Sequence, residues 1–200
     1  NNCMFSVTAG LVAYDMSTNS SVTSINNVHI AGASLQGSGE TFTMSGGLIG
    51  ITSLSGTASD NQNNFEGSIN LRGSMSQQVS VGGLYGVMEG GTRSVNNSYA
   101  NADIQINNTY SGESAFSIAG GLVGGIGLIE QDPTSPIFNN SYASGSINHS
   151  STEPSNTVLL GGIAGVTTRE ISINNSFSHH NITDSQPGIN GGVGGVIGAL

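Results

Sequence analysis

The chain has 200 residues and little charge: it contains no lysine, only Arg72, Arg93 and Arg169, and twelve acidic residues, for a formal net charge of −9 at pH 7. Binding to nucleic acid or to an anionic membrane surface requires clustered lysine and arginine, so the composition excludes both partners. No apolar run approaches the roughly 18 residues that a membrane-spanning helix needs, so we expect no membrane span in this segment.

Glycine is abundant, with 31 residues, whereas hydrophobic residues make up only 36% of the chain. This balance indicates tight turns and stacked polar positions, and the regular placement of Leu, Ile, Val and Phe argues against disorder. Cys3 is the only cysteine, which excludes an internal disulfide and a cysteine-based zinc site. We expect Cys3 to be a small buried hydrophobic residue. Because the chain begins with Asn1 rather than Met, we interpret it as a processed or excised piece, so the lack of a signal-peptide pattern does not indicate a cytosolic protein.

A Gly-Gly-apolar-x-Gly signature returns along the whole chain. Its copies occupy residues 46–50, 82–86, 120–124, 161–165 and 191–195, with a degenerate first copy at 9–13. Self-similarity of this kind predicts a repeat architecture, in which one core grows with each copy. We therefore expect residues 1–200 to form a single domain.

Each repeat also contains an Asn pair followed by an apolar or aromatic residue. The pairs begin at Asn26, Asn63, Asn96, Asn139 and Asn174, and a short alternating run follows each of them. A third alternating element precedes each Gly-Gly pair, as in residues 42–44 and 116–118. Alternation with a period of two predicts strands. The variable segments 53–62, 90–95, 130–136 and 150–155 are expected to be loops.

These elements predict an all-β fold, a right-handed parallel β-helix with three short strands per coil and about five to six coils. In such a solenoid, equivalent residues of successive coils stack on one another. We expect one internal ladder of Leu11, Leu48, Leu84, Leu122, Ile163 and Val193, and another of Val28, Phe65, Tyr99, Tyr142 and Phe177. The recurrent glycines are expected at corners, where they allow positive φ and close backbone approach.

The best-formed repeat has a Gly-Gly-Leu-Val-Gly core at residues 120–124 and an Asn-Ser-Tyr-Ala-x-Gly-x-Ile run at 140–147. This pattern closely resembles the GLUG-motif repeat of large surface and secreted proteins, often adhesin-like, from bacteria and some microbial eukaryotes. The resemblance covers nearly the whole chain; the copy at 191–195 is truncated and the copy at 9–13 lacks the first and last glycines. It implies an extracellular β-solenoid and supplies no catalytic residues or cofactor.

The side chains with catalytic potential are better explained by structure. Asp60, Asp103, Asp132 and Asp184 fall at different phases of the repeat, so we interpret them as solvated loop acids rather than a sugar-cleaving pair. In an alternating strand, one ring of His179-His180 points inward and the other outward, which leaves no partner for a metal. We predict no catalytic, cofactor or metal-binding residues and no enzyme activity.

Seven Asn-x-Ser/Thr sequons are candidate N-glycosylation sites: Asn19, Asn96, Asn107, Asn139, Asn148, Asn174 and Asn181. Three of them share one repeat phase, so glycans there would form a stripe. Stacked asparagines that hydrogen-bond the backbone explain the same pairs equally well. In that arrangement Asn97, Asn140 and Asn175 would face inward and the preceding Asn outward.

Both ends of the chain are apolar, and no polar segment caps the final coil. The candidate assembly residues are Met4, Phe5, Val193, Val196, Ile197 and Leu200. Two interpretations remain open: head-to-tail stacking of copies into a filament, and a slice of a longer parent solenoid.

The sequence thus predicts an extracellular or cell-surface structural or adhesive rod, with further copies, a parent chain, glycans or a host surface as candidate partners. The alternative is a β-helical carbohydrate-active enzyme, or the carbohydrate-binding portion of one. Acids clustered on one exposed coil face would favour that alternative.

Overall fold

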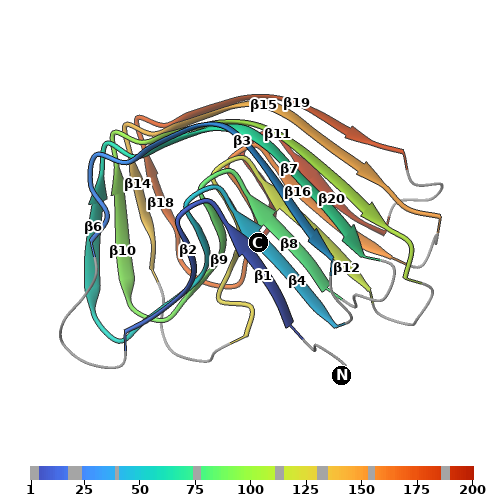
Figure 1. Ribbon diagram of the computed structural model, residues 1–200, viewed down its shortest axis with the longest axis horizontal. Coiled ribbons are helices and arrows are strands. Elements are labelled where there is room, and N and C mark those ends of the chain that lie inside the picture. The colour runs from blue at the N-terminus through green and yellow to red at the C-terminus, as the bar shows by residue number, and fades with distance from the viewer. Residues whose placement is uncertain are drawn as a thin grey trace.

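The computed structural model describes residues 5–17, 24–38, 41–73, 78–110, 115–129, 135–152, 156–185 and 190–200. These residues form strands and no helix, and hence no helix that could cross a membrane. The strands stack into four parallel sheets that surround a common interior (Figure 1). The predicted β-solenoid is confirmed.

A complete coil visits the four sheets in the order A, B, C, D. Sheet A contains β1 (Phe5–Ala9), β4 (Phe42–Gly46), β8 (Gln78–Gly82), β12 (Phe116–Gly120), β16 (Thr157–Gly161) and β20 (Asn190–Gly194). Sheet B contains β2 (Val12–Ser17), β5 (Ile49–Leu54), β9 (Tyr85–Glu89), β13 (Val123–Ile126), β17 (Ala164–Thr167) and β21 (Ile197–Ala199). Sheet C contains β6 (Thr57–Asn61), β10 (Thr92–Asn96), β14 (Ile137–Asn139) and β18 (Ser172–Asn174). Sheet D contains β3 (His29–Ser38), β7 (Asn64–Gly73), β11 (Tyr99–Asn108), β15 (Tyr142–Ser150) and β19 (Phe177–Asp184).

The chain winds clockwise as it recedes from the viewer of Figure 1, so the solenoid is right-handed. Four coils possess all four strands, from β4–β7 to β16–β19. The first coil reaches sheet C only through a bridge between Asn26 and Asn61, and the last coil consists of β20 and β21 among the described residues. The expected five to six coils are therefore four complete ones and two partial ones.

The expectation of three strands per coil was wrong, because the strands of sheet C were missed. Both β6 and β10 lie in segments that we expected to be loops. Their buried positions are Ala58 and Asp60 in β6 and Arg93 and Val95 in β10. A charged residue at one of the two inward positions hides the alternation of apolar residues that identifies a strand.

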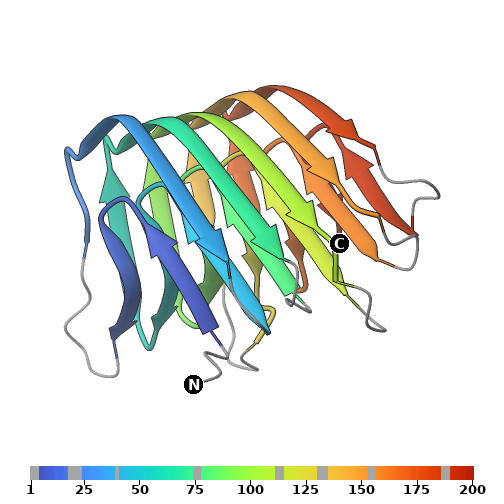
Figure 2. The ribbon, with the colours of Figure 1, turned by 45° about the vertical axis from the view of Figure 1, so that its right-hand side comes forward.

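Sheet D forms the broad outer face of the solenoid (Figure 2). In β11 every second side chain is buried and the others are exposed. Its inward positions continue ladders through the coils: Ile69, Ile104 and Ile147 are register partners, and all three are fully buried. The outer face is polar, which explains the low hydrophobic content of the chain.

The Gly-Gly pair forms the corner between sheets A and B. A Cβ at Gly121 would overlap the Gly162 carbonyl oxygen of the next coil and lie 2.6 Å from Ala143 Cβ in sheet D. The third glycine serves a different contact: a Cβ at Gly86 would lie 2.8 Å from the Ser45 carbonyl oxygen, because sheets A and B pack closely. None of these glycines has a positive φ. Close approach is thus the reason for the signature, and the expected positive φ was wrong here.

Positive φ occurs instead at the corner between sheets C and D. The corner residues are Asn27, Gln62, Asn97, Asn140 and Asn175, with φ between 47° and 59°. Asparagine tolerates the left-handed region better than most other residues, which explains the second Asn of each pair. In the second coil the equivalent pair is Asn61-Gln62, not Asn63-Asn64.

That shift changes the predicted aromatic ladder. Phe65 pairs with Ala100 and is fully buried, whereas Tyr99 pairs with Asn64 one position earlier. Because neighbouring strand residues face opposite sides, Tyr99 lies on the outer face with Tyr142 and Phe177. The expectation of one internal ladder containing Phe65 and these three rings was wrong.

The leucine ladder is confirmed over its middle members, because Leu48, Leu84, Leu122 and Ile163 are all fully buried. Its last member is Val196 rather than Val193, since the Ile163 amide donates to the Val196 carbonyl oxygen. Gly161 pairs with Gly194, so the last signature copy is residues 194–198 and not 191–195. The neighbouring Gly191-Gly192 pair obscured this register in the sequence.

Candidate functional site

The two ends of the corner ladder are open to solvent. Leu11, whose amide donates to the Leu48 carbonyl oxygen, is 48% exposed, and Val196 at the other end is 46% exposed. The four members between them are completely buried. The side chains at the ends are therefore core residues that no further coil covers among the described residues.

The other predicted assembly residues divide between the ends. Val193 pairs with the buried Leu160 and is 49% exposed, Ile197 is half-buried, and Leu200 is 90% exposed. Phe5 lies in β1, but its side chain and all of Met4 lie outside the described residues. The structure therefore brings the predicted C-terminal residues together on the last coil.

The last coil ends in a step. Sheets A and B each have six strands, sheet D has five and sheet C has four, so β20 and β21 extend one strand beyond β19 and β18. Any solenoid that continues from this end must add a strand to sheets C and D before it adds one to sheet A. The unpaired edges of β18 and β19 are available for that pairing.

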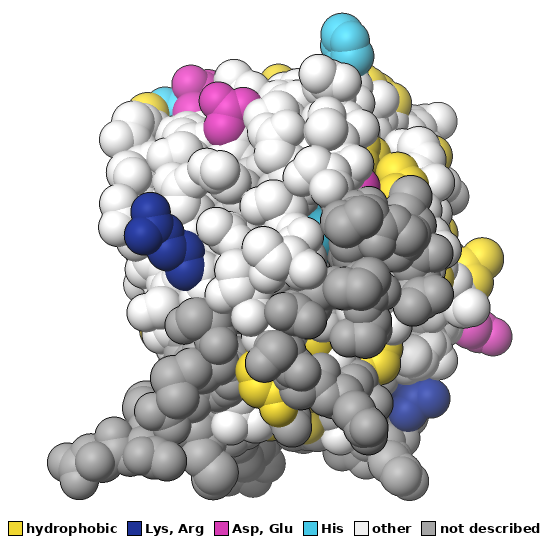
Figure 3. Space-filling model, turned by 90° about the vertical axis from the view of Figure 1, so that its right-hand side faces the viewer, with side chains coloured by type: hydrophobic (Ala, Val, Ile, Leu, Met, Phe, Trp, Pro, Cys, Tyr) yellow, Lys and Arg dark blue, Asp and Glu magenta, His cyan; other side chains and the backbone are white. Residues whose placement is uncertain are grey.

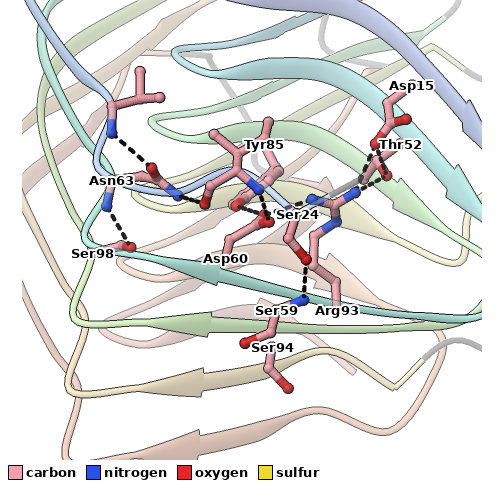
Figure 4. Close-up of polar contacts among 12 residues, drawn as sticks. Asp15, Ser24, Thr52, Ser59, Asp60, Asn63, Tyr85, Arg93, Ser94 and Ser98 are labelled. Atoms are coloured by element: carbon pink, nitrogen blue, oxygen red, sulfur yellow. Dashed lines mark hydrogen bonds and ion pairs between the residues drawn. The ribbon is translucent and has the colours of Figure 1, made fainter. Parts of the chain in front are cut away.

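A buried ionic cluster crosses the interior near the other end (Figure 4). Arg93 Nη1 lies 2.5 Å from Asp60 Oδ2, and Arg93 Nη2 lies 2.7 Å from Asp15 Oδ2. Thr52 Oγ1 accepts a further bond from Arg93 at 3.0 Å, and Tyr85 Oη donates to Asp60 Oδ2 at 2.5 Å. The cluster joins sheets B and C across three successive coils.

The environment of this cluster keeps its phenol neutral. Burial raises the pKa of Tyr85 well above its usual value, and the Asp60 carboxylate raises it further. Asp60 Oδ1 also accepts a bond from the Ile25 amide at 2.8 Å. Asp60 and Arg93 are at most 2% exposed, and the cluster is suited to cross-linking coils.

Sequence reasoning missed this cluster because Asp60 was expected in a solvated loop, and that expectation was wrong. The sequence contained a signal for strands β6 and β10. Arg93-Ser94-Val95-Asn96 and Ala58-Ser59-Asp60-Asn61 occupy the same repeat position, directly before the asparagine corner, so aligning them would have indicated a fourth strand in each coil.

The remaining predicted acids do not gather into a catalytic site. Asp103 lies exposed on the outer face of sheet D and accepts a bond from Ser146 at 2.9 Å. Asp184 is not a solvated loop acid, because it lies 2.9 Å from His149 Nδ1 and its side chain is 3% exposed. Asp132 lies outside the described residues.

The orientation predicted for the histidine pair is confirmed, with His179 exposed and His180 turned inward. Burial lowers the pKa of His180 to about 4. Within the described part of the chain, no group of three His, Cys, Asp or Glu side chains is placed to hold a metal ion.

The asparagine corner carries two outer ladders. Asn139 Nδ2 donates to Asn96 Oδ1 at 2.9 Å, and Asn174 Nδ2 donates to Asn139 Oδ1 at 3.0 Å. Asn97, Asn140 and Asn175 are exposed, so the expectation that they face inward was wrong. The inward ladder consists of the following serines: the Ser98 amide donates to Ser141 Oγ, and the Ser141 amide to Ser176 Oγ.

The sequons therefore lie in two environments. The side-chain amides of Asn96, Asn139 and Asn174 already donate hydrogen bonds within the corner ladder. Asn107, Asn148 and Asn181 are exposed on the outer face of sheet D, and Asn19 lies outside the described residues. Glycosylation is sterically simpler on sheet D than at the corner.

An aromatic stack borders this outer face. The rings of Tyr99 and Tyr142 are 4.9 Å apart, and those of Tyr142 and Phe177 are 5.3 Å apart, both nearly parallel. Tyr99 Oη donates to Glu66, and this hydrogen bond raises the pKa of Tyr99 to about 12. Phe177 ends the stack and is 58% exposed.

A scan of the chain against protein-family models gives no match, and a search of curated proteins gives none either. The likeness to GLUG-motif repeats therefore rests on the motifs quoted above.

Proposed function

We propose that the protein is a structural β-solenoid rod whose exposed C-terminal coil binds a further coil of the same repeat, in a second copy or in a longer parent chain. The observation that carries this proposal is the environment of Gly195. A Cβ at the equivalent Gly162 would overlap the Gly195 carbonyl oxygen of the following coil, whereas a Cβ at Gly195 would meet nothing within 4 Å.

Glycine loses more conformational entropy on folding than other residues do, and the described structure gives no steric reason for a glycine at this corner. An incoming coil would supply that reason. Val193 and Val196, which lie beside it, would then become as buried as Leu160 and Ile163. Full burial of an apolar side chain contributes about 1.5–3 kcal/mol, so covering these half-exposed valines would add to the backbone pairing of an incoming coil.

Light scattering and electron microscopy of the purified chain test the proposal. We expect wild-type rods to lengthen with concentration, and both Gly195→Val and Val193→Asp to stop this growth. Ile129→Asp is a matched control, because Ile129 is 48% exposed on an earlier coil. A wild-type chain that stays monomeric at every concentration would overturn stacking between copies.

An extracellular or cell-surface location, with an adhesive role toward glycans or a host surface, is supported by the GLUG-like motifs. A rod of this kind requires no catalytic residue. Turnover of a glycan substrate that is lost on replacing a single acid would defeat the structural proposal.

A further inference from the structure

A polar hollow of about 540 Å³ lies at the C-terminal ends of β3, β7 and β11. Its polar lining consists of Gln36, Ser38, Asn70, Arg72, Gln105 and Asn107. The volume falls within the range of small-molecule sites, about 300–1,000 Å³. Figure 3 shows the side of the molecule where these strands end, and few of the described side chains on it are charged.

The side chains of this hollow are arranged in two rows across adjacent strands. Gln36, Asn70 and Gln105 are register partners, as are Arg72 and Asn107 one row further along. Parallel strands are about 4.8 Å apart, so the rows present amide groups at that interval.

These side chains differ from the asparagine ladders of the corner in one respect. Asn96 and Asn139 bond to each other, whereas Gln36, Asn70, Arg72, Gln105 and Asn107 make no side-chain hydrogen bond or ion pair to any described residue. The amides of the hollow therefore do not stabilise the sheet through mutual bonds. Their donors and acceptors remain available to a ligand.

The hydrogen-bond donors and acceptors of the lining indicate which class of ligand fits it. Each amide offers two donors and an acceptor, whereas an anion can only accept and would leave the amide oxygens unpaired. Among the described residues of the lining only Arg72 is charged, and the net charge of −9 opposes polyanions. Hydroxyl groups donate and accept together, so a polyhydroxylated ligand satisfies the whole lining.

We propose that this hollow binds a neutral saccharide, with the amides of Gln36, Asn70 and Gln105 pairing with its hydroxyl groups and Arg72 donating to its oxygens. The proposal is independent of coil stacking, because the hollow lies on the first three D strands and the stacking surface on the last coil.

Titration calorimetry of the full chain, made without glycosylation, tests the site. The probes are cellotriose, xylotriose, mannotriose and chitotriose as neutral ligands, and trigalacturonate as the acidic one. We expect at least one neutral trisaccharide to bind, and Arg72→Ala and Gln105→Leu each to weaken it by about tenfold or more. Arg169→Ala removes the same charge elsewhere and should leave binding unchanged.

Three results would overturn the proposal: no neutral trisaccharide binds, binding is confined to trigalacturonate, or Arg72→Ala and Arg169→Ala bind equally well. Because Arg72 and Gln105 are exposed, we expect both variants to keep the wild-type circular dichroism spectrum. An Arg72→Lys variant that retains part of the affinity would support donation from a cation at this position.

Discussion

Asp60 and Arg93 form a salt bridge inside the solenoid although they are not register partners. Asp60 is aligned with Val95, and Arg93 with Ala58, so the ion pair crosses sheet C diagonally. One coil carries a carboxylate and the next a guanidinium, each in the place of an apolar residue. The pair therefore links two successive coils through the interior.

Removing one partner of this pair should be strongly destabilising. Arg93→Ala leaves the Asp60 carboxylate buried without a counter-ion, and we expect a loss of about 3–5 kcal/mol in the free energy of unfolding. The double variant Asp60→Val, Arg93→Ala copies the aligned residues and should lose less than the sum of the single variants. Urea unfolding measures all three. Additive losses would show that the two side chains are not coupled.

The corner glycines should differ sharply in tolerance. Gly121→Ala introduces a Cβ against the next coil and should cost about 1–3 kcal/mol or more through overpacking. Gly195→Ala changes the same repeat position where nothing lies within 4 Å, and should stay within about 0.5 kcal/mol. Thermal unfolding of dilute protein compares them. Equal losses would contradict the close-approach explanation.

The aromatic stack should stabilise the outer corner. Tyr142 lies between two rings, and such pairs contribute about 0.5–1.5 kcal/mol each beyond burial. We expect Tyr142→Ala to lower the free energy of unfolding by about 1–3 kcal/mol on that basis. Tyr142→Phe keeps both contacts and serves as the control. Equal free energies of unfolding for the two variants would show that ring stacking does not stabilise this corner.

His180 should make stability depend on pH. Its pKa is lowered to about 4 in the folded protein by burial, against about 6.5 in the unfolded chain. Between pH 4 and 6.5 the unfolded chain therefore binds more protons than the folded protein, so the free energy of unfolding rises with pH. The stability associated with neutral His180 is fully present above pH 6.5 and is lost as the pH falls toward 4. Asp103 opposes this shift and His179 adds to it.

The measurement is the unfolding midpoint in urea at several pH values between 4 and 7. We expect His180→Gln to flatten the profile relative to wild type, and the exposed neighbour variant His179→Gln to retain most of the slope. A His180→Gln profile that matches wild type across this range would assign the pH dependence to other groups.

The repeat pattern by itself determined the fold class and the core of the corner. Parallel coils place equivalent residues on top of one another, so residues that stack in the core recur at the same position of each repeat. The recurrence of Leu48, Leu84 and Leu122 could therefore be read from the sequence alone. The same reasoning located the apolar residues of the last coil and the opposite directions of His179 and His180.

Only the tertiary structure decided which face each ladder occupies, since a shift of one residue turns a strand side chain to the opposite side. The corner of the second coil is at Gln62, so Phe65 is aligned with the buried Ala100 and not with the outward-facing Tyr99. At the C-terminal end, the Gly191-Gly192 pair hid the fact that the last copy of the signature is residues 194–198. Charged residues at inward positions are invisible to hydrophobic periodicity. The salt bridge between Asp60 and Arg93 therefore appears only once two successive coils are stacked, because its partners come from different repeats.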